Sequence, residues 1–357
     1  MEEASNKTFP ASTLWKKILV LVVLAVLVVL FFVIGLLVGS SHLGFVESIQ
    51  ALFGVGDPSS VRIVQNIRLP RVLAALLAGA GLSLSGLLMQ TTLRNPMASP
   101  ATLGVSNAAV FGANLSIIGF AGGYLSTGNN IQNYTSSINP FAASSIAFLF
   151  SLGAILFVLF LTKFKKFNPQ TVILTGIALG FLFQAGTTIL QFFASDIGIS
   201  AAVVWSFGDL GRATFETDWI MLAVIAMSLV AALLLQWRYN AMGLGEEVAS
   251  SLGVKVAALR FFTLLIASLL TAVIVSFLGI IGFVGIICPH AMKRLIGHNH
   301  KYLIPASVLA GSVLTLFADV ISRLIGNGTA LPIGAITSLL GAPFFLYLVF
   351  AKKEGEA

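Results

Sequence analysis

The sequence predicts an all-α protein that crosses a membrane several times, from its composition, the length of its apolar segments and the placement of its charges. Of 357 residues, 57% are hydrophobic and 9% charged, whereas soluble domains have about 45–50% apolar and ~25% charged residues. Apolar segments of about 18 or more residues recur along the chain, and each is long enough for a membrane-spanning helix. A membrane β-barrel would instead show alternation within segments of roughly ten residues.

The first apolar segment, residues 18–39, predicts a helix that stays in the membrane. It is too long for the apolar core of a secretion signal, which has about 7–15 residues, and no small-residue cleavage site follows it. Lys16 and Lys17 precede it, and no Lys or Arg stands in residues 40–46 after it. Since cytoplasmic flanks carry the excess of Lys and Arg, residues 1–17 are predicted to be a cytoplasmic tail.

Further apolar segments follow in order and predict further spans. They lie at about 72–92, 101–122, 140–162, 172–194, 219–237, 261–278, 283–295, 302–323 and 332–351. Together with the first this makes ten, so both termini are predicted to be cytoplasmic, with a single membrane domain at 18–351 and a tail at 352–357. A polar outer loop is expected at 122–139, and an apolar stretch at 197–207, too short to cross, predicts a surface or re-entrant helix.

The division between spans seven and eight is the least regular. Residues 261–292 contain no Asp, Glu, Lys or Arg, a run too long for one crossing and too short for two full ones. Gly279, Gly282 and Gly285 lie inside this run, where the chain can bend sharply. We therefore expect a full span that ends near Leu278 and a short one that begins near Phe283.

The distribution of Lys and Arg supports this topology. Of the 20 such residues, five fall on the predicted outer side, namely Arg62, Arg68, Arg71, Arg212 and Arg323, and the other 15 fall on the inner side. This is the asymmetry of the positive-inside rule. The net charge of +7 is thus explained by membrane orientation, and no nucleic-acid partner is implied.

Arg68 and Arg71 stand where a long uncharged stretch begins, so they predict a cationic docking surface on the outer lip of a helix. Snorkelling to lipid headgroups is the alternative. Asp319 is the only carboxylate inside a predicted span, and its i,i+4 spacing to Arg323 predicts an ion pair. Because this only carboxylate lies at the outer end of its span and not at mid-membrane, a proton or sodium relay finds little support.

Several kinds of site find no support in the sequence. There is no nucleotide-binding G-x-x-x-x-G-K-[ST] motif, and Gly79-Ala80-Gly81 lies inside an apolar helix, where glycines favour helix packing. The single cysteine, Cys288, excludes an intrachain disulfide and a cysteine-based metal cluster. His298 and His300 lack further ligands nearby, so no metal site is expected.

The inner loop at 238–260 contains the second informative segment. Gly243 and Gly253 bracket a short amphipathic helix, with an apolar stripe of Leu244, Val248 and Leu252. Its first turn carries Glu246 and Glu247, where the helix dipole favours acids. The small residues Ala249, Ser250 and Ser251 form its expected exposed flank. Such a helix can sit in a groove of another protein, or it can be an ordinary loop helix on the membrane.

Three sets of motifs in this order resemble the FecCD-type permeases, which are ABC importer subunits for iron–siderophores, haem and vitamin B12. The first runs from Arg68-Leu-Pro-Arg71 through Asn95-Pro96 to Leu103-Gly-Val-Ser-Asn107, and the second from Leu244-Gly-Glu246 to Leu252-Gly253. The third runs from Gly282-Phe-Val-Gly285 through Pro289-His290 and Ala318-Asp319 to Leu331-Pro-Ile-Gly334 and Leu340-Gly-Ala-Pro343. The resemblance extends from about Val61 to Phe350.

The resemblance implies a type II ABC importer permease with ten helices and an inverted repeat relating helices two to five and seven to ten. It implies four further partners: a second permease subunit, as a homodimer or heterodimer, two cytoplasmic ATPases, and an extracytoplasmic substrate-binding protein. The chain itself would be no enzyme and hold no cofactor, because ATP and Mg²⁺ would bind to the ATPases. It would lie in the plasma membrane.

The resemblance also implies roles for particular residues. Arg68, Arg71 and Arg323 would offer cations to glutamates of the binding protein. The coupling segment would contact the ATPase and comprises Leu244, Gly245, Glu246, Glu247, Ala249, Leu252 and Gly253. The inner gate would lie at Asn168-Pro169-Gln170-Thr171, where Pro169 and Gln170 depart from the small hydroxyl residues of the vitamin B12 permease. Helix five would line the path with Gln184, Thr187, Thr188 and Gln191, although hydrogen bonding between helices explains them equally well.

The sequence thus predicts the permease subunit of an ATP-driven importer, working by alternating access. An iron–siderophore complex is the expected substrate, with haem or a cobalamin as alternatives. A stand-alone secondary carrier or channel, and a structural partner in an export complex, are rival hypotheses from other classes.

Overall fold

The computed structural model describes residues 11–39, 43–120, 140–165, 167–326 and 330–350. The predicted outer loop 122–139, the C-terminal tail and most of the N-terminal tail lie outside the described residues. The helices are α1 (Ala11–Leu37), α2 (Phe45–Leu52), α3 (Pro58–Ile63), η1 (Val64–Arg68), α4 (Leu69–Thr92), α5 (Val105–Asn114), η2 (Leu115–Phe120), α7 (Pro140–Lys163), α8 (Pro169–Phe192), α9 (Asp196–Ser206), η4 (Leu210–Arg212), α10 (Phe215–Leu234), α11 (Gln236–Gly243), α12 (Glu246–Ser251), α13 (Val256–Leu278), α14 (Val284–Ile296), α15 (His300–Ile325) and α16 (Ile333–Phe350).

The second predicted span, 72–92, is the inner part of a longer continuous helix, Pro58–Thr92. This helix begins earlier because Asp57 caps it by accepting from the Ser59 amide at 3.1 Å, and Pro58 favours the first helical position. The wider π turn η1 immediately precedes Leu69-Pro70, where the proline ring would crowd the carbonyl four residues earlier in a regular helix. At ~1.5 Å per residue, 35 residues extend about 52 Å, beyond the ~30 Å hydrocarbon core.

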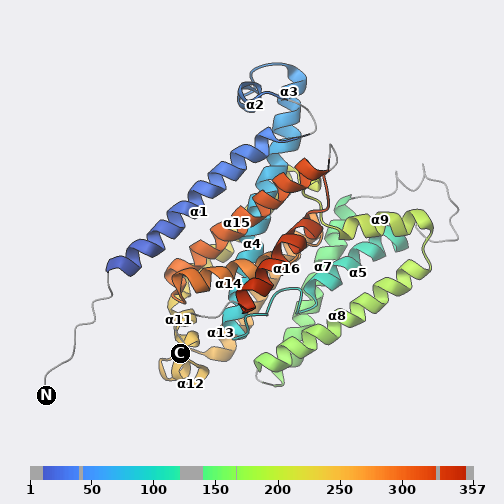
Figure 1. Ribbon diagram of the computed structural model, residues 1–357. Coiled ribbons are helices and arrows are strands. Elements are labelled where there is room, and N and C mark those ends of the chain that lie inside the picture. Colours follow the sequence, from blue (N-terminus) through green and yellow to red (C-terminus); the bar gives the residue numbers. More distant parts are fainter. Residues whose placement is uncertain (1–10, 40–42, 121–139, 166, 327–329, 351–357) are drawn as a thin grey trace.

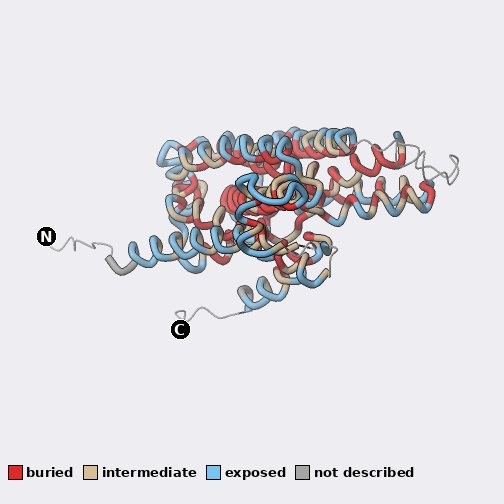
Figure 2. Tube along the Cα trace, turned by 90° about the horizontal axis from the view of Figure 1, so that it is seen from above, coloured by how far each residue is buried: buried red, intermediate tan, exposed pale blue. Residues whose placement is uncertain are grey.

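Helix α4 is the central element of the structure. It packs against α15, α13, α14 and α10, and 89% of its most apolar 18-residue window is buried. Figure 2, which views the molecule from above, shows buried residues gathered at its centre and exposed residues around them. The second predicted span is therefore enclosed by the protein's own helices rather than by lipid.

Glycines allow this close packing at two levels of α4. A Cβ atom on Gly79 would lie 2.2 Å from the carbonyl oxygen of Gly311 on α15, and one on Gly86 would lie 1.7 Å from that of Gly285 on α14. Real side chains cannot occupy such positions, so only glycine permits these backbones to approach. This agrees with the helix-packing role predicted for Gly79.

Among the described residues, seven helices are long and apolar enough to cross a membrane, and they coincide with seven predicted spans. Shorter helices occupy the other three positions, at Val105–Phe120, α14 and α16. The predicted break is present, because α13 ends at Leu278 and α14 begins at Val284. A short helix, α9, is also present at the predicted apolar stretch. Span six was placed too late at 219–237, since α10 begins at Phe215 after the Thr214 cap.

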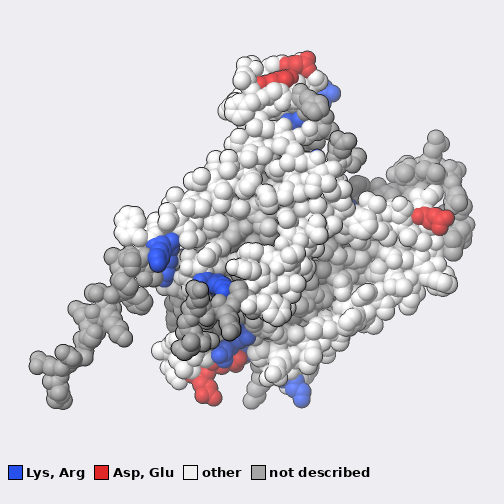
Figure 3. Space-filling model, viewed as in Figure 1, with Lys and Arg blue, Asp and Glu red and all other residues white. Residues whose placement is uncertain are grey.

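Charged and uncharged side chains occupy different parts of the molecular surface. On the face drawn in Figure 3, Lys, Arg, Asp and Glu side chains lie at the top, toward the lower left and bottom, and at the right edge, and the broad surface between them is uncharged. Figure 1 places α2 and α3 at one end and α12 at the opposite end, with α1 along one side. Only 6% of the most apolar window of α1 is buried, as expected of a helix with a face toward lipid.

Candidate functional site

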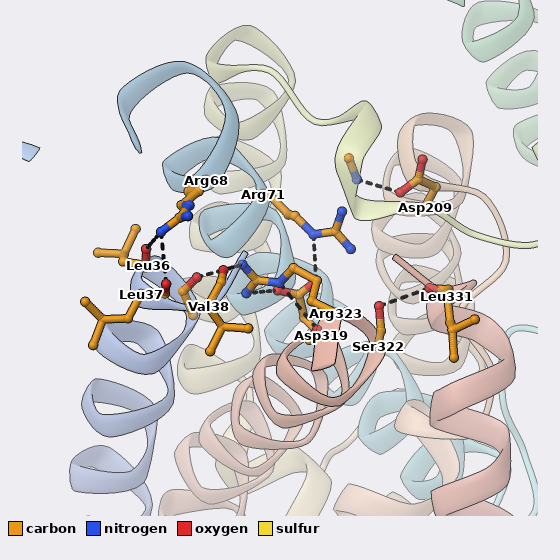
Figure 4. A network of polar contacts seen from close by, with 12 residues as sticks. Leu36, Leu37, Val38, Arg68, Arg71, Asp209, Asp319, Ser322, Arg323 and Leu331 are labelled. Carbon is orange, nitrogen blue, oxygen red and sulfur yellow. Dashed lines mark hydrogen bonds and ion pairs between the residues drawn. The ribbon is translucent and has the colours of Figure 1, made fainter. Parts of the chain in front are cut away.

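An arginine cluster lies where the outer parts of α4 and α15 meet the end of α1 (Figure 4). Asp319 is fully buried and accepts from both neighbouring cations. Its Oδ1 lies 2.8 Å from Arg71 Nε, and its Oδ2 lies 2.5 Å from Arg323 Nη2. The ion pair predicted from i,i+4 spacing is therefore present, and Arg71 from α4 joins it across 248 residues of sequence.

Arg68 and Arg323 bind the C-terminal end of α1. Arg68 Nη1 donates to the carbonyls of Leu36 and Leu37 at 2.9 and 3.0 Å, and Arg323 Nη1 donates to those of Gly35 and Val38 at 2.8 and 2.5 Å. The last carbonyls of a helix have no partner within it, and cations are favoured there. Both arginines therefore donate hydrogen bonds to carbonyls of their own chain, and Arg68 is only 3% exposed.

Arg71 differs from these two arginines. Its side chain is 12% exposed, and it contacts Asp319 through Nε. Its terminal nitrogens make no hydrogen bond within the described part of the chain, and in Figure 4 they point away from Asp319. Of the three arginines predicted for docking, Arg71 is therefore the one that retains donor groups for an external acceptor.

The inner segment 244–253 forms a short helix, α12, directly after α11. Gly245 and Gly253 have φ angles of +124° and +82°, so glycines at these two positions permit the sharp turns on either side. The predicted apolar stripe, Leu244, Val248 and Leu252, is exposed. The assignment of Ala249 to the exposed flank was wrong: it is fully buried against the body of the protein, whereas Ser250 and Ser251 are exposed.

The predicted gate residues begin α8. Asn168 caps this helix by accepting from the amides of Gln170 and Thr171 at 3.0 and 3.4 Å, with Pro169 at the first position. A cavity of about 530 Å³ lies beside this cap and is lined by Leu93, Arg94, Asn95, Pro96, Asn168, Pro169, Gln170, Ile173 and Glu246. The fold thus brings the predicted gate and the first residue of the coupling helix to one cavity, and Thr171 is the gate residue that does not line it.

The polar residues of α8 divide between two environments. Thr187 is buried and donates to the Phe183 carbonyl at 2.9 Å, and Gln191 donates to Asn114 on α5 at 3.0 Å. Gln184 and Thr188 lie on the exposed surface of α8. Interhelical hydrogen bonding therefore accounts for Gln191, while Gln184 and Thr188 remain available to line a path.

Two buried charged residues were not singled out from the sequence. Arg260 on α13 was counted only as an inner cation, although its position among apolar residues at the start of a span was a signal. Asp218 was placed before a span, yet it lies in the first turn of α10 and is 4% exposed. Neither carboxylate oxygen of Asp218 has a hydrogen-bond partner among the described residues.

Histidines and acids do not gather into a metal site in the described ranges, where no group of three or more His, Cys, Asp or Glu side chains could hold an ion. His300 is instead a hydrogen-bonded core residue. Its Nε2 lies 3.0 Å from Thr91 Oγ1 and its Nδ1 lies 2.8 Å from Asn240 Oδ1. It therefore joins α4, α11 and α15 at the inner end.

Comparison with known proteins gives these sites a context. The model of the FecCD transport family matches residues 26–351. A putative ABC transporter permease of Methanocaldococcus jannaschii is 45% identical over 94% of this chain and 95% of its own length. An Fe(3+)-citrate import permease of Bacillus subtilis is 32% identical over 94% and 95%, and a molybdate import permease of Haemophilus influenzae is 33% identical over 93% and 95%.

A solved structure agrees with these relatives. It is described as an inward-facing conformation of a putative metal-chelate type ABC transporter, and it superposes with a TM-score of 0.79 at 30% identity. The match covers 94% of this chain and all of the other. The chain belongs to the FecCD transport family and is an ABC transporter permease subunit, a multi-pass protein of the plasma membrane that is not itself an enzyme.

Proposed function

We propose that this permease subunit imports an iron–siderophore complex, which a substrate-binding protein delivers and ATP hydrolysis on partner subunits drives across the membrane. The observation that carries the ATP-driven part is the exposed apolar stripe Leu244, Val248 and Leu252 on α12. A stripe of large apolar side chains at the charged inner end favours burial against another protein. The iron chelate is favoured by the relative named for Fe(3+)-citrate import and the solved structure described as metal-chelate type.

The proposed assembly contains two permease subunits, two cytoplasmic ATPases and the binding protein. In this proposal the chain crosses the membrane ten times with both termini in the cytoplasm. Spanning helices two to five and seven to ten are related as an inverted repeat. Helices at all ten predicted positions support the count. ATP-driven closure of the ATPases moves α12, and the two permease subunits shift so that the site opens alternately outward and inward.

The proposed path runs along α8 and ends at a gate formed by residues 168–171. Gln184 and Thr188 offer an uncharged, weakly polar surface, which suits a bulky chelate that must slide without tight binding. The gate proposal is supported by the cavity that residues 168–170 share with Glu246 of α12. Movement of the coupling helix α12 would therefore change the position of the residues at the inner end of the path.

The binding protein is proposed to dock over the arginine cluster. Arg71 would be the principal cation that contacts the binding protein, and Arg68 and Arg323 would hold the end of α1 in place beside it. Replacing Arg71 by glutamine is expected to weaken binding-protein docking at least about tenfold, because a charged hydrogen-bond donor is lost at the interface. Surface plasmon resonance on the reconstituted complex measures the affinity. Assembly with the ATPase should be unchanged.

The matched control for this prediction is Arg62→Gln, which removes an exposed outer arginine from α3. This variant should dock like the unaltered protein. Arg71→Gln with unaltered affinity, or an equal loss in both variants, would argue against the docking role of Arg71.

Substrate identity is tested by growth under iron limitation, since a permease named for molybdate import is as similar as the iron relative. A deletion strain should fail to grow on a ferric siderophore, and complementation with this gene should restore growth. Haemin, cyanocobalamin and molybdate serve as parallel substrates, each with its own growth condition. Restored use of one of these alone would replace the iron–siderophore assignment, and uptake by the purified chain without an ATPase would establish a secondary carrier.

A further inference from the structure

We propose that Arg260 is the positioning residue that joins the coupling helix α12 to the inner gate, so that movement of α12 is transmitted to the start of α8. This inference rests on the proposed ATP-driven function and adds the residue that connects its two inner parts. Arg260 lies in the first turns of α13 and is 2% exposed. A buried guanidinium needs an acceptor for each of its donor groups, so its partners define what it holds together.

The three nitrogens of Arg260 bind three different elements. Nη2 lies 2.6 Å from Glu246 Oε1 at the start of α12. Nη1 donates to the Phe167 carbonyl at 2.7 Å, in the turn directly before the Asn168 cap. Nε donates to the carbonyl of Thr92, the last residue of α4, at 3.1 Å. One planar group therefore fixes the relative positions of α12, the end of α4, and the turn at Phe167 directly before the predicted gate, which we call the gate turn.

The gate turn is held at this point by a second contact from α13. Phe167 has a φ of +55°, a left-handed conformation that side-chain-bearing residues adopt only when their surroundings favour it. Its ring packs against that of Phe261, next to Arg260, with centroids 5.8 Å apart. The carbonyl and the ring of Phe167 are thus both bound to α13, so a displacement of α13 carries the turn and the Asn168 cap with it.

Glu246 is placed to receive the movement from outside. It is partly exposed and lines the cavity beside residues 168–170. It is also the first residue of α12, whose apolar stripe is exposed at the inner end of the protein. Separating Glu246 from Arg260 would leave a buried cation with only neutral carbonyl partners, which is strongly unfavourable. When an ATPase moves α12, the pair therefore moves together, and Arg260 transfers the displacement to the gate turn.

The functional test compares uptake with ATP hydrolysis in the same proteoliposomes that contain the complete transporter. Arg260→Lys keeps the charge but cannot reach three acceptors together, and Glu246→Gln keeps an acceptor but removes the charge. Arg260→Lys is expected to hydrolyse ATP within about twofold of the unaltered complex, while substrate transported per ATP falls at least tenfold. Glu246→Gln should lower the same ratio of transport to hydrolysis. Arg238→Lys, the same change at an exposed arginine of α11, should leave this ratio unaltered.

Unaltered coupling in both variants, or hydrolysis and uptake that fall in proportion, would overturn the proposal. The second of these results would show that Arg260 only maintains the fold. Failure of the proposed function itself is seen separately, because the unaltered complex would then show no ATP-driven uptake.

A distance measurement tests the connection without transport. Gln170→Cys on α8 and Ser250→Cys on α12 are exposed positions for spin labels, and the native Cys288 is buried. Pulsed electron paramagnetic resonance on the purified full chain should give one narrow distance distribution. The added change Arg260→Lys should broaden it, and Arg238→Lys should not. Equal widths in all three proteins would contradict a connection through Arg260, whatever the transporter imports.

Discussion

Replacing Asp319 by alanine is expected to lower the free energy of unfolding by about 3–5 kcal/mol, because removing one partner of a buried ion pair leaves an uncompensated charge. Here two cations lose the same partner, Arg71 at 2.8 Å and Arg323 at 2.5 Å. Arg323 also holds the end of α1, so this helix should lose part of its attachment. Thermal unfolding of the detergent-solubilised protein should show a midpoint lower by at least about 5 °C.

Two variants control for the loss of charge and of shape at Asp319. Asp319→Asn keeps the size and an oxygen acceptor, so its midpoint should lie between those of the alanine variant and the unaltered protein. Asp196→Asn removes an exposed carboxylate at the start of α9 and should change the midpoint little, because exposed charges contribute little to stability. An Asp319→Ala protein that unfolds at the unaltered temperature would contradict the structural role of the cluster.

The parts of the fold that depend on local sequence could be predicted. The break between α13 and α14 follows from glycines inside an uncharged run, and the Asp319–Arg323 pair follows from helical spacing. The glycines around α12 indicated a short helix at the correct place. In each case the deciding residues lie within a few positions of each other, where backbone geometry alone sets which groups meet.

The parts that depend on packing between distant helices could not be predicted. Arg68 was placed on an outer surface, but its carbonyl acceptors lie on α1, 31 and 32 residues earlier. Ala249 is buried because α12 rests on the protein body with that side, which a six-residue helix does not reveal through its spacing. Arg260 contacts residues 14, 93 and 168 positions away, and no local pattern brings these together.

Helix α4 connects the two candidate sites physically. Its first turn carries Arg71, shortly after Arg68 at the end of η1, and the carbonyl of its last residue, Thr92, accepts from Arg260 at the inner end. Because α4 is enclosed by four other helices, a change in its packing should reach both ends of the molecule. The contacts made by Gly86 inside this helix are therefore a sensitive place to test the architecture.

Replacing Gly86 by alanine is expected to cost more than about 3 kcal/mol, the upper end of ordinary overpacking, and to reduce the yield of folded protein sharply. The new Cβ would lie 1.7 Å from the Gly285 carbonyl oxygen, a backbone atom of α14 that cannot rotate away. Separating α4 from α14 would also strain the hydrogen bonds from Gln90 to the Gly285 and Ile286 carbonyls, at 3.2 and 3.1 Å. Yield after size-exclusion chromatography and the thermal midpoint measure the effect.

Gly153→Ala is the matched control, because a Cβ at this position of α7 meets no atom within 4 Å beyond its chain neighbours and the backbone of its own helix. Alanine is favoured over glycine in a helix by up to ~1 kcal/mol, so this variant should be as stable as the unaltered protein or more so. The two substitutions add the same methyl group to a helical glycine and differ only in what it meets. Similar midpoints and yields for the two variants would show that α4 and α14 do not approach as closely as their glycines allow, and the central position of α4 would have to be reconsidered.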